Sequence, residues 1–100
     1  MSQWVPLNTL RGGIMAELLQ EYSTRIEAAD GEYIVRSYGE QRADGTWTGW
    51  LEFSRPSTGH VLRTGQETSQ PDRTAVEYWA TGLEPVYFEG AFQRARERSH

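Results

Sequence analysis

A β-hairpin is predicted for Tyr33–Ser54, because apolar and polar side chains alternate there on both sides of a turn. The strands Glu32–Arg42 and Thr46–Ser54 flank Ala43-Asp44-Gly45, and an aspartate followed by a glycine is typical of hairpin turns. This hairpin is the strongest structural signal in the chain.

The turn allows two alignments of the strands. A two-residue turn at Asp44-Gly45 pairs Arg42 with Trp47, whereas a three-residue loop closed by Gly45 in the left-handed conformation pairs Arg42 with Thr46. We expect the second alignment, because a shift by one residue would bury arginine without a partner at a cost of several kcal/mol, by order of magnitude about 2–7. The facing pairs are then Val35–Phe53, Arg36–Glu52, Tyr38–Trp50 and Gly39–Gly49. One face collects Tyr33, Val35, Trp47, Leu51 and Phe53, and the other collects Arg36, Glu40, Arg42, Thr48 and Glu52.

A third strand is predicted for Gly59–Thr64, after a turn that contains proline and glycine. A four-residue loop after Arg55 places Leu62 beside Phe53 on the apolar face. The two hairpins therefore agree on one inward face, which supports the alignment. The opposite face gains a charged row across three strands: Arg36, Glu52 and Arg63.

A helix is predicted for Ile14–Ala28, ahead of the hairpin, because its apolar residues recur three and four positions apart. Gly13 permits its start, and Asp30-Gly31 supplies its end and the next turn. We expect residues 1–12 to form a loosely held arm. The apolar residues of the helix are Ile14, Met15, Leu18, Leu19, Tyr22 and Ile26, and those that could tie down the arm are Trp4, Val5 and Leu7.

Two more helices are predicted near the C-terminus. The first begins at Pro71 with Gln70 as its cap, and it ends at Gly82 in the left-handed conformation. The second begins at Pro85, although Val86-Tyr87-Phe88 could instead form a short fourth strand. The expected inward residues are Ala75, Val76, Trp79 and Ala80 in the first helix, and Val86, Tyr87, Ala91 and Ala95 in the second.

Composition narrows the class of protein. The chain has 100 residues, 37% hydrophobic and 24% charged, as expected for one globular domain. It lacks both a signal-peptide pattern and the roughly 18–20 consecutive apolar residues of a membrane helix, so we expect a cytoplasmic protein with no membrane partner. The absence of cysteine excludes disulfides and thiolate chemistry. The net charge of −4 disfavours a nucleic-acid partner.

Aromatic residues are unusually frequent, with four Trp and five Tyr. The predicted alignment places Tyr38 and Trp50 together on the charged face of the sheet. Either the helix at Ile14–Ala28 covers this pair, or the pair is an exposed platform. If exposed beside Arg36 and Arg63, it has the composition of a protein-interaction hot spot, and it could also stack unpaired bases.

A polar segment joins the third strand to the following helix. It is rich in hydroxyl and amide side chains, which can cap and turn the backbone or can bind a polar ligand. Its candidate ligand-binding residues are Arg63, Thr64, Gln66, Thr68 and Gln70.

Other candidate chemistry is weak. His60 and His100 are isolated, and Ser57 with His60 lacks any nucleophile motif. No metal-ligand spacing is present, although Glu77, Glu84 and Glu89 could converge if the last two helices form a tight hairpin. Arg11-Gly12-Gly13 could hold an anion but lacks the lysine and glycine spacing of a phosphate loop, so a hinge is favoured. We therefore expect no catalytic residues, no metal and no cofactor.

Three blocks resemble those of short, uncharacterised bacterial proteins. They are Tyr38–Trp47, Leu62–Pro71 and Tyr78–Tyr87, within a likeness that covers about Tyr33–Ala95. No activity comes with this resemblance, so it implies no site residues. The predicted order of three strands and a helix is also similar in topology to the antitoxin domain of HicB type, which shares no motif with this chain and does not fix function.

These patterns predict one α+β domain: a three-stranded antiparallel meander with an N-terminal helix and one or two C-terminal helices. The C-terminal helices cover one face of the sheet, and the N-terminal helix packs against an edge or the second face. The expected function is a non-enzymatic protein-interaction or regulatory module that forms a homodimer or binds another protein. The alternatives are a small ligand-binding protein or enzyme that uses the polar segment 63–71, and a binder of single-stranded nucleic acid.

Overall fold

The computed structural model describes residues 16–99, and its central element is the predicted hairpin. Strand β2 (Gly31–Gln41) pairs antiparallel with β3 (Trp47–Ser54), in the alignment of the three-residue loop. The Arg42 N–H donates to the Thr46 carbonyl at 2.7 Å, and Gly45 has a φ of 91°, as the loop requires. The predicted register is therefore confirmed.

The sheet has five strands rather than three. Strand β4 (Val61–Arg63) pairs with β3 as predicted, with Leu62 opposite Phe53. Strand β5 (Thr68–Gln70) pairs with the other end of β3, so that β4 and β5 share one side of that strand. The prediction that this polar segment is a loop throughout was wrong, because extended backbone there completes hydrogen bonds that β3 would otherwise leave open.

Strand β1 (Glu17–Ala28) replaces the predicted N-terminal helix. It lies at one edge of the sheet, whose strand order is β1-β2-β3-β4. Its register with β2 shifts between Leu18 and Gln20, and again between Glu21 and Arg25. These irregularities interrupt the two-residue alternation of a strand. The side chain of Leu19 lies against the inward position of Gly39, so Leu19, Tyr22 and Ile26 share one face at spacings of three and four residues, which imitates a helical face. The remaining part of that prediction, Ile14 and Met15, lies outside the described residues, as do the arm at 1–12 and its Trp4, Val5 and Leu7.

Two helices follow the sheet. Helix α1 (Arg73–Thr81) begins two residues later than predicted, because Asp72, not Gln70, caps it by accepting from the Ala75 N–H at 2.9 Å. Gly82 ends it with a φ of −89°, so the predicted left-handed cap is wrong. Helix α2 (Pro85–Arg98) starts at its proline as predicted, and the alternative strand at 86–88 is not formed.

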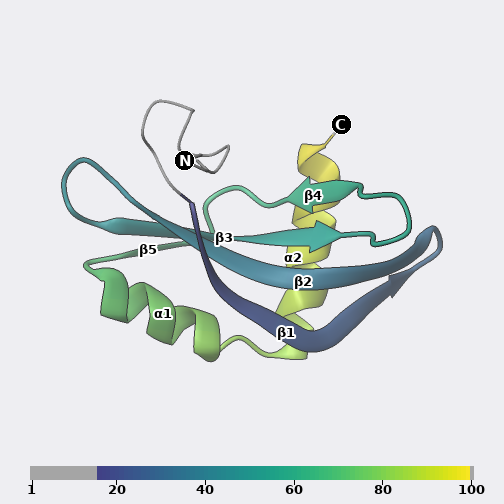
Figure 1. Cartoon of the computed structure of the whole chain (residues 1–100), viewed down its shortest axis with the longest axis horizontal. Helices are drawn as coiled ribbons and strands as arrows, with labels where there is room; N and C mark the ends of the chain where they lie inside the picture. Colours follow the sequence, from purple (N-terminus) through teal and green to yellow (C-terminus); the bar gives the residue numbers. More distant parts are fainter. Residues whose placement is uncertain (1–15, 100) are drawn as a thin grey trace, which may run out of the picture.

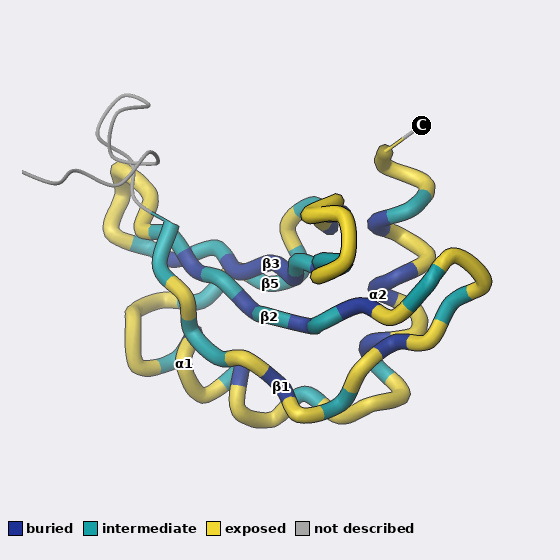
Figure 2. The backbone as a smooth tube through the Cα atoms, turned by 45° about the vertical axis from the view of Figure 1, so that its right-hand side comes forward, coloured by how far each residue is buried: buried dark blue, intermediate teal, exposed yellow. Residues whose placement is uncertain are grey.

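Both helices cover the same face of the sheet, and in Figure 1 α2 crosses behind the strands. Tyr22 joins β1, β2 and α1, because its hydroxyl bonds the Ala80 carbonyl at 2.6 Å and the Ser37 hydroxyl at 3.0 Å. Figure 2 shows buried positions along the central strands β2 and β3 and on α2. Val86 was predicted to face inward but is 76% exposed, and Phe88 and Phe92 fill the core instead. The core residues are Tyr22, Ile26, Tyr33, Val35, Leu51, Phe53, Leu62, Phe88, Ala91, Phe92 and Ala95.

Gly49 allows α1 to approach the sheet closely, because a Cβ there would lie 2.8 Å from the Trp79 ring and 2.9 Å from the Thr68 methyl. We therefore expect Gly49→Ala to lower the free energy of unfolding by about 1–3 kcal/mol, measured by urea denaturation. Gly39→Ala, at the facing position, is the control: its Cβ would meet only the flexible end of Leu19 at 3.1 Å. Equal losses in the two variants would contradict the close packing of Trp79.

Candidate functional site

The helix-free face of the sheet carries a stack of three side chains. The rings of Tyr38 and Trp50 lie 6.1 Å apart with an interplanar angle of 14°, and the Arg63 guanidinium carbon lies 4.1 Å from the centre of the Trp50 ring. Trp50 is only 2% exposed, whereas Arg63 is exposed. Cation–π contact of this kind contributes roughly 0.5–2 kcal/mol. We call Tyr38, Trp50 and Arg63 the aromatic stack.

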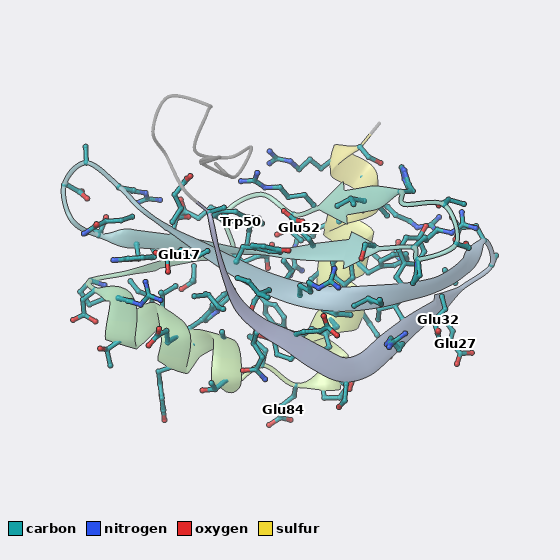
Figure 3. All side chains as sticks on the ribbon, viewed as in Figure 1. Glu17, Glu27, Glu32, Trp50, Glu52 and Glu84 are labelled. Atoms are coloured by element: carbon teal, nitrogen blue, oxygen red, sulfur yellow. The ribbon has the colours of Figure 1, made fainter. Side chains whose placement is uncertain are left out.

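A second feature of this face is a row of alternating charges across four strands. Glu21, Arg36, Glu52 and Arg63 are neighbours in the registers of β1 to β4. The Arg36 Nε donates to the Glu21 carboxylate at 2.8 Å. Glu52 accepts from the Trp50 indole N–H at 3.2 Å, and Figure 3 shows these two side chains together on β3. The predicted row of Arg36, Glu52 and Arg63 is confirmed by the register, and β1 extends it by one acid, Glu21. We call these four residues the charged row.

The charged row acts electrostatically on the hydroxyl of Tyr38, the tyrosine of the aromatic stack. Burial, followed by the negative charge of Glu52, raises the pKa of Tyr38 above its usual value, while the charge of Arg36 opposes this shift. Tyr38 therefore stays a neutral hydroxyl at physiological pH.

Polar side chains of the segment 63–71 form hydrogen bonds within the chain. Thr64 is fully buried, and its hydroxyl accepts from the Leu51 N–H at 3.1 Å and donates to the Gly65 carbonyl at 2.8 Å. Gln66 bonds Arg42, and the Gln70 amide donates to the Thr68 hydroxyl at 2.6 Å. Of the candidates in this segment, Arg63 lies with Tyr38, Trp50 and Arg36 on the helix-free face, because it pairs with Glu52 in the sheet and stacks on Trp50.

The sequence patterns did not predict a hydrogen-bonded cluster around one carboxylate of this segment, that of Glu67. Glu67 accepts from the Tyr87 hydroxyl and from Arg94, the latter at 2.6 Å. Burial alone would raise the pKa of Glu67, but the hydrogen bonds from Arg94 and Tyr87 and the arginine charge together lower it. Burial, followed by the hydrogen bond with Glu67, raises the pKa of Tyr87 to about 12. Only α2 packing beside the segment brings these groups together, so no local sequence motif reveals them.

The remaining sequence candidates do not form a site in the described part of the chain. Glu77 pairs with Arg73, and no group of three or more potential metal ligands occurs among residues 16–99. His60 is exposed beside the β3–β4 turn. Arg11-Gly12-Gly13 and His100 lie outside the described residues.

The function of this chain has to be argued from its own geometry, because comparison with known proteins identifies no relative. No protein-family model, curated protein or solved structure matches it. The resemblance to short bacterial proteins and the HicB-type topology thus stay predictions. None of the described helices is both long and apolar enough to cross a membrane.

The raised pKa of Tyr87 predicts a specific loss of stability in alkali. An unfolded tyrosine releases its proton near pH 10, whereas folded Tyr87 keeps it to about pH 12. The stabilising contribution is complete below pH 10 and is lost as the pH rises through this window. In urea titrations across that range, Tyr87→Phe should therefore lose stability less steeply than wild type. Tyr78→Phe, which removes an exposed hydroxyl from α1, should follow the wild-type slope; a Tyr87→Phe slope equal to wild type would refute the assignment.

Proposed function

We propose that the chain is a non-enzymatic interaction module that associates with a second copy of itself through the helix-free face of its sheet. The supporting observation is the charged row, in which acids and bases alternate across the whole width of that face. Both helices lie on the opposite face, so no described helix covers this surface.

The charged row is complementary to itself under twofold symmetry. If the symmetry axis runs parallel to the strands and passes between Arg36 and Glu52, the row of the second copy is reversed. Glu21 then faces Arg63 of the second copy, and Arg36 faces Glu52. Every acid therefore meets a base, and such complementarity favours one orientation of two associating surfaces.

The apolar residues of the same face support this arrangement. The adjacent row contains Leu18 opposite Tyr38, whose ring is only partly buried. Leu18 is 54% exposed near one edge of the sheet, and Val61 is 49% exposed near the other. These exposed apolar groups flank the charged row on its two sides and add apolar area to the surface that a dimer would bury.

The alternative functions have less support. A ligand-binding role for the segment 63–71 would need free polar groups, yet Thr64, Gln66 and Gln70 are bonded within the chain. Binding of single-stranded nucleic acid would need accessible rings and uncompensated arginines. Trp50 is buried, Arg36 is paired with Glu21, and the net charge is −4.

Charge exchange between the two edges of the sheet tests this proposal. Arg63→Glu or Glu21→Arg alone should weaken dimerisation about tenfold, because each places like charges opposite one another twice. The double variant should recover most of the loss, since arginine at 21 then faces glutamate at 63. The measurement is sedimentation equilibrium of wild type and variants from about 1 µM to about 1 mM.

Recovery in the double variant cannot come from contact within one chain. Positions 21 and 63 are separated by three strand spacings, about 14 Å, which exceeds the Debye length of about 8 Å at physiological salt. Glu77→Arg, on the outer surface of α1, serves as a control for net charge and should leave dimerisation unchanged. A wild-type protein that stays monomeric over the whole range, or a double variant no tighter than either single variant, would overturn the proposal.

A further inference from the structure

Three arginines gather at the short connection between β4 and β5, residues 64–67. Every arginine of residues 16–99 other than Arg42, Arg63 and Arg98 forms an ion pair with a carboxylate. The Arg42 guanidinium instead bonds the side chain of Gln66, and Arg63 directly precedes the connection. Arg98, in the last turn of α2, lies so close to Gly65 that a Cβ on this glycine would be 2.9 Å from its Nη1. Positive charge without an acidic partner is therefore concentrated here.

The backbone of the connection offers two further hydrogen-bond donors. The N–H groups at its ends, those of Thr64 and Glu67, donate to carbonyls of β3 at 3.0 and 2.8 Å. Between them, the N–H groups of Gly65 and Gln66 donate to no acceptor in the described part of the chain, and neither residue is buried. Figure 1 shows this connection leaving β4, the edge strand, and passing to β5. Two adjacent donors at the rim of the sheet are thus open to a ligand.

No acidic side chain of the connection neutralises these groups. Its one carboxylate, that of Glu67, is 7% exposed and binds Arg94 and Tyr87 of α2. The side chains of Thr64 and Gln66 are bonded within the chain. The groups left for a ligand are therefore backbone N–H and guanidinium groups, all of which are donors. Such a set favours an anion over a neutral polar molecule, because hydrogen bonds from guanidinium to an anion are charge-assisted.

We propose that this connection binds a phosphate group, either as the free ion or as a monoester. Backbone N–H groups and guanidinium groups are donors that phosphate sites commonly use. Arg98 approaches from the α2 side of the sheet. Arg42 approaches from the helix-free face, where it bonds Ser69 at 3.2 Å. The three acceptor oxygens of a tetrahedral phosphate at the rim can bond both guanidinium groups and the backbone between them, whereas a planar carboxylate has only two oxygens.

A titration followed by two-dimensional nuclear magnetic resonance tests this site. Isotope-labelled protein is titrated with inorganic phosphate and, separately, with glycerol phosphate, while chloride keeps the ionic strength constant. We expect the amide signals of Gly65 and Gln66 to shift and to saturate with a Kd of about 1 mM. The amide of Gly59, which is hydrogen-bonded in the β3–β4 turn, should not shift. Saturation by either ligand supports the site, and the tighter of the two identifies a monoester or the free ion. Shifts that grow linearly and equally along the chain, as in a general salt effect, would overturn the proposal.

Matched variants locate the site. Arg98→Gln and Arg42→Gln should each weaken phosphate binding about fivefold, because each removes one exposed charge contact. Arg25→Gln removes the same charge from β1, at the opposite edge of the sheet, and should change the affinity less than twofold, about the size of a neutral surface change. All three substituted positions are exposed, so folding is not at risk.

This inference goes beyond the proposed dimer and fails separately from it. Arg42 and Arg98 are not part of the charged row, so their variants should dimerise like wild type. Equal phosphate affinity in the Arg98 and Arg25 variants would refute the phosphate site and leave the dimer proposal intact. A wild-type protein that binds phosphate but stays monomeric would refute the dimer alone and support the phosphate site.

Discussion

The alignment of β2 with β3 is the constraint on which the rest of the structure depends. It fixes which side of the sheet each residue occupies, because a shift of one residue would exchange the two faces. In the observed register Val35 and Phe53 face the helices, while Arg36 and Glu52 face away. The hydrophobic core, the charged row and the aromatic stack all follow from this single alignment. Gly45 stabilises it locally, since the loop that closes the hairpin requires a positive φ.

Elements governed by short-range patterns could be predicted from the sequence. The hairpin loop, the pairing of Leu62 with Phe53 and the start of α2 at Pro85 each depend on a few adjacent residues. β1 could not be predicted, because its irregular register spaces Leu19, Tyr22 and Ile26 three and four residues apart, as in a helix, and only pairing with β2 distinguishes the two structures. β5 was missed for a related reason: its polar sequence forms a strand because β3 offers it backbone partners.

In the candidate site, too, the features that depend on short-range patterns could be predicted, and those that depend on long-range packing could not. The pairing of Tyr38 with Trp50 follows from the hairpin register and was predicted, whereas the burial of Trp50 depends on how side chains of several strands meet. Arg63 lies beside Glu52 in the register, as predicted, and the stacking of its guanidinium on the indole of Trp50 was not predicted. The cluster of Glu67 with Tyr87 and Arg94 arises from the packing of helix α2 beside the polar segment. It could not be predicted, because its members lie in two segments that are far apart in the sequence.

The central claim can be tested most directly by nuclear Overhauser measurements across the hairpin. Leu51 directs its carbonyl toward Thr64 of the β4 side, so it forms a non-hydrogen-bonded pair with Ser37, in which the two Cα atoms approach closely. Strong contacts between the Cα protons of Ser37 and Leu51, and of Val35 and Phe53, are therefore expected. Contacts between Arg36 and Phe53, and between Tyr38 and Leu51, would instead indicate the two-residue turn and would contradict the account.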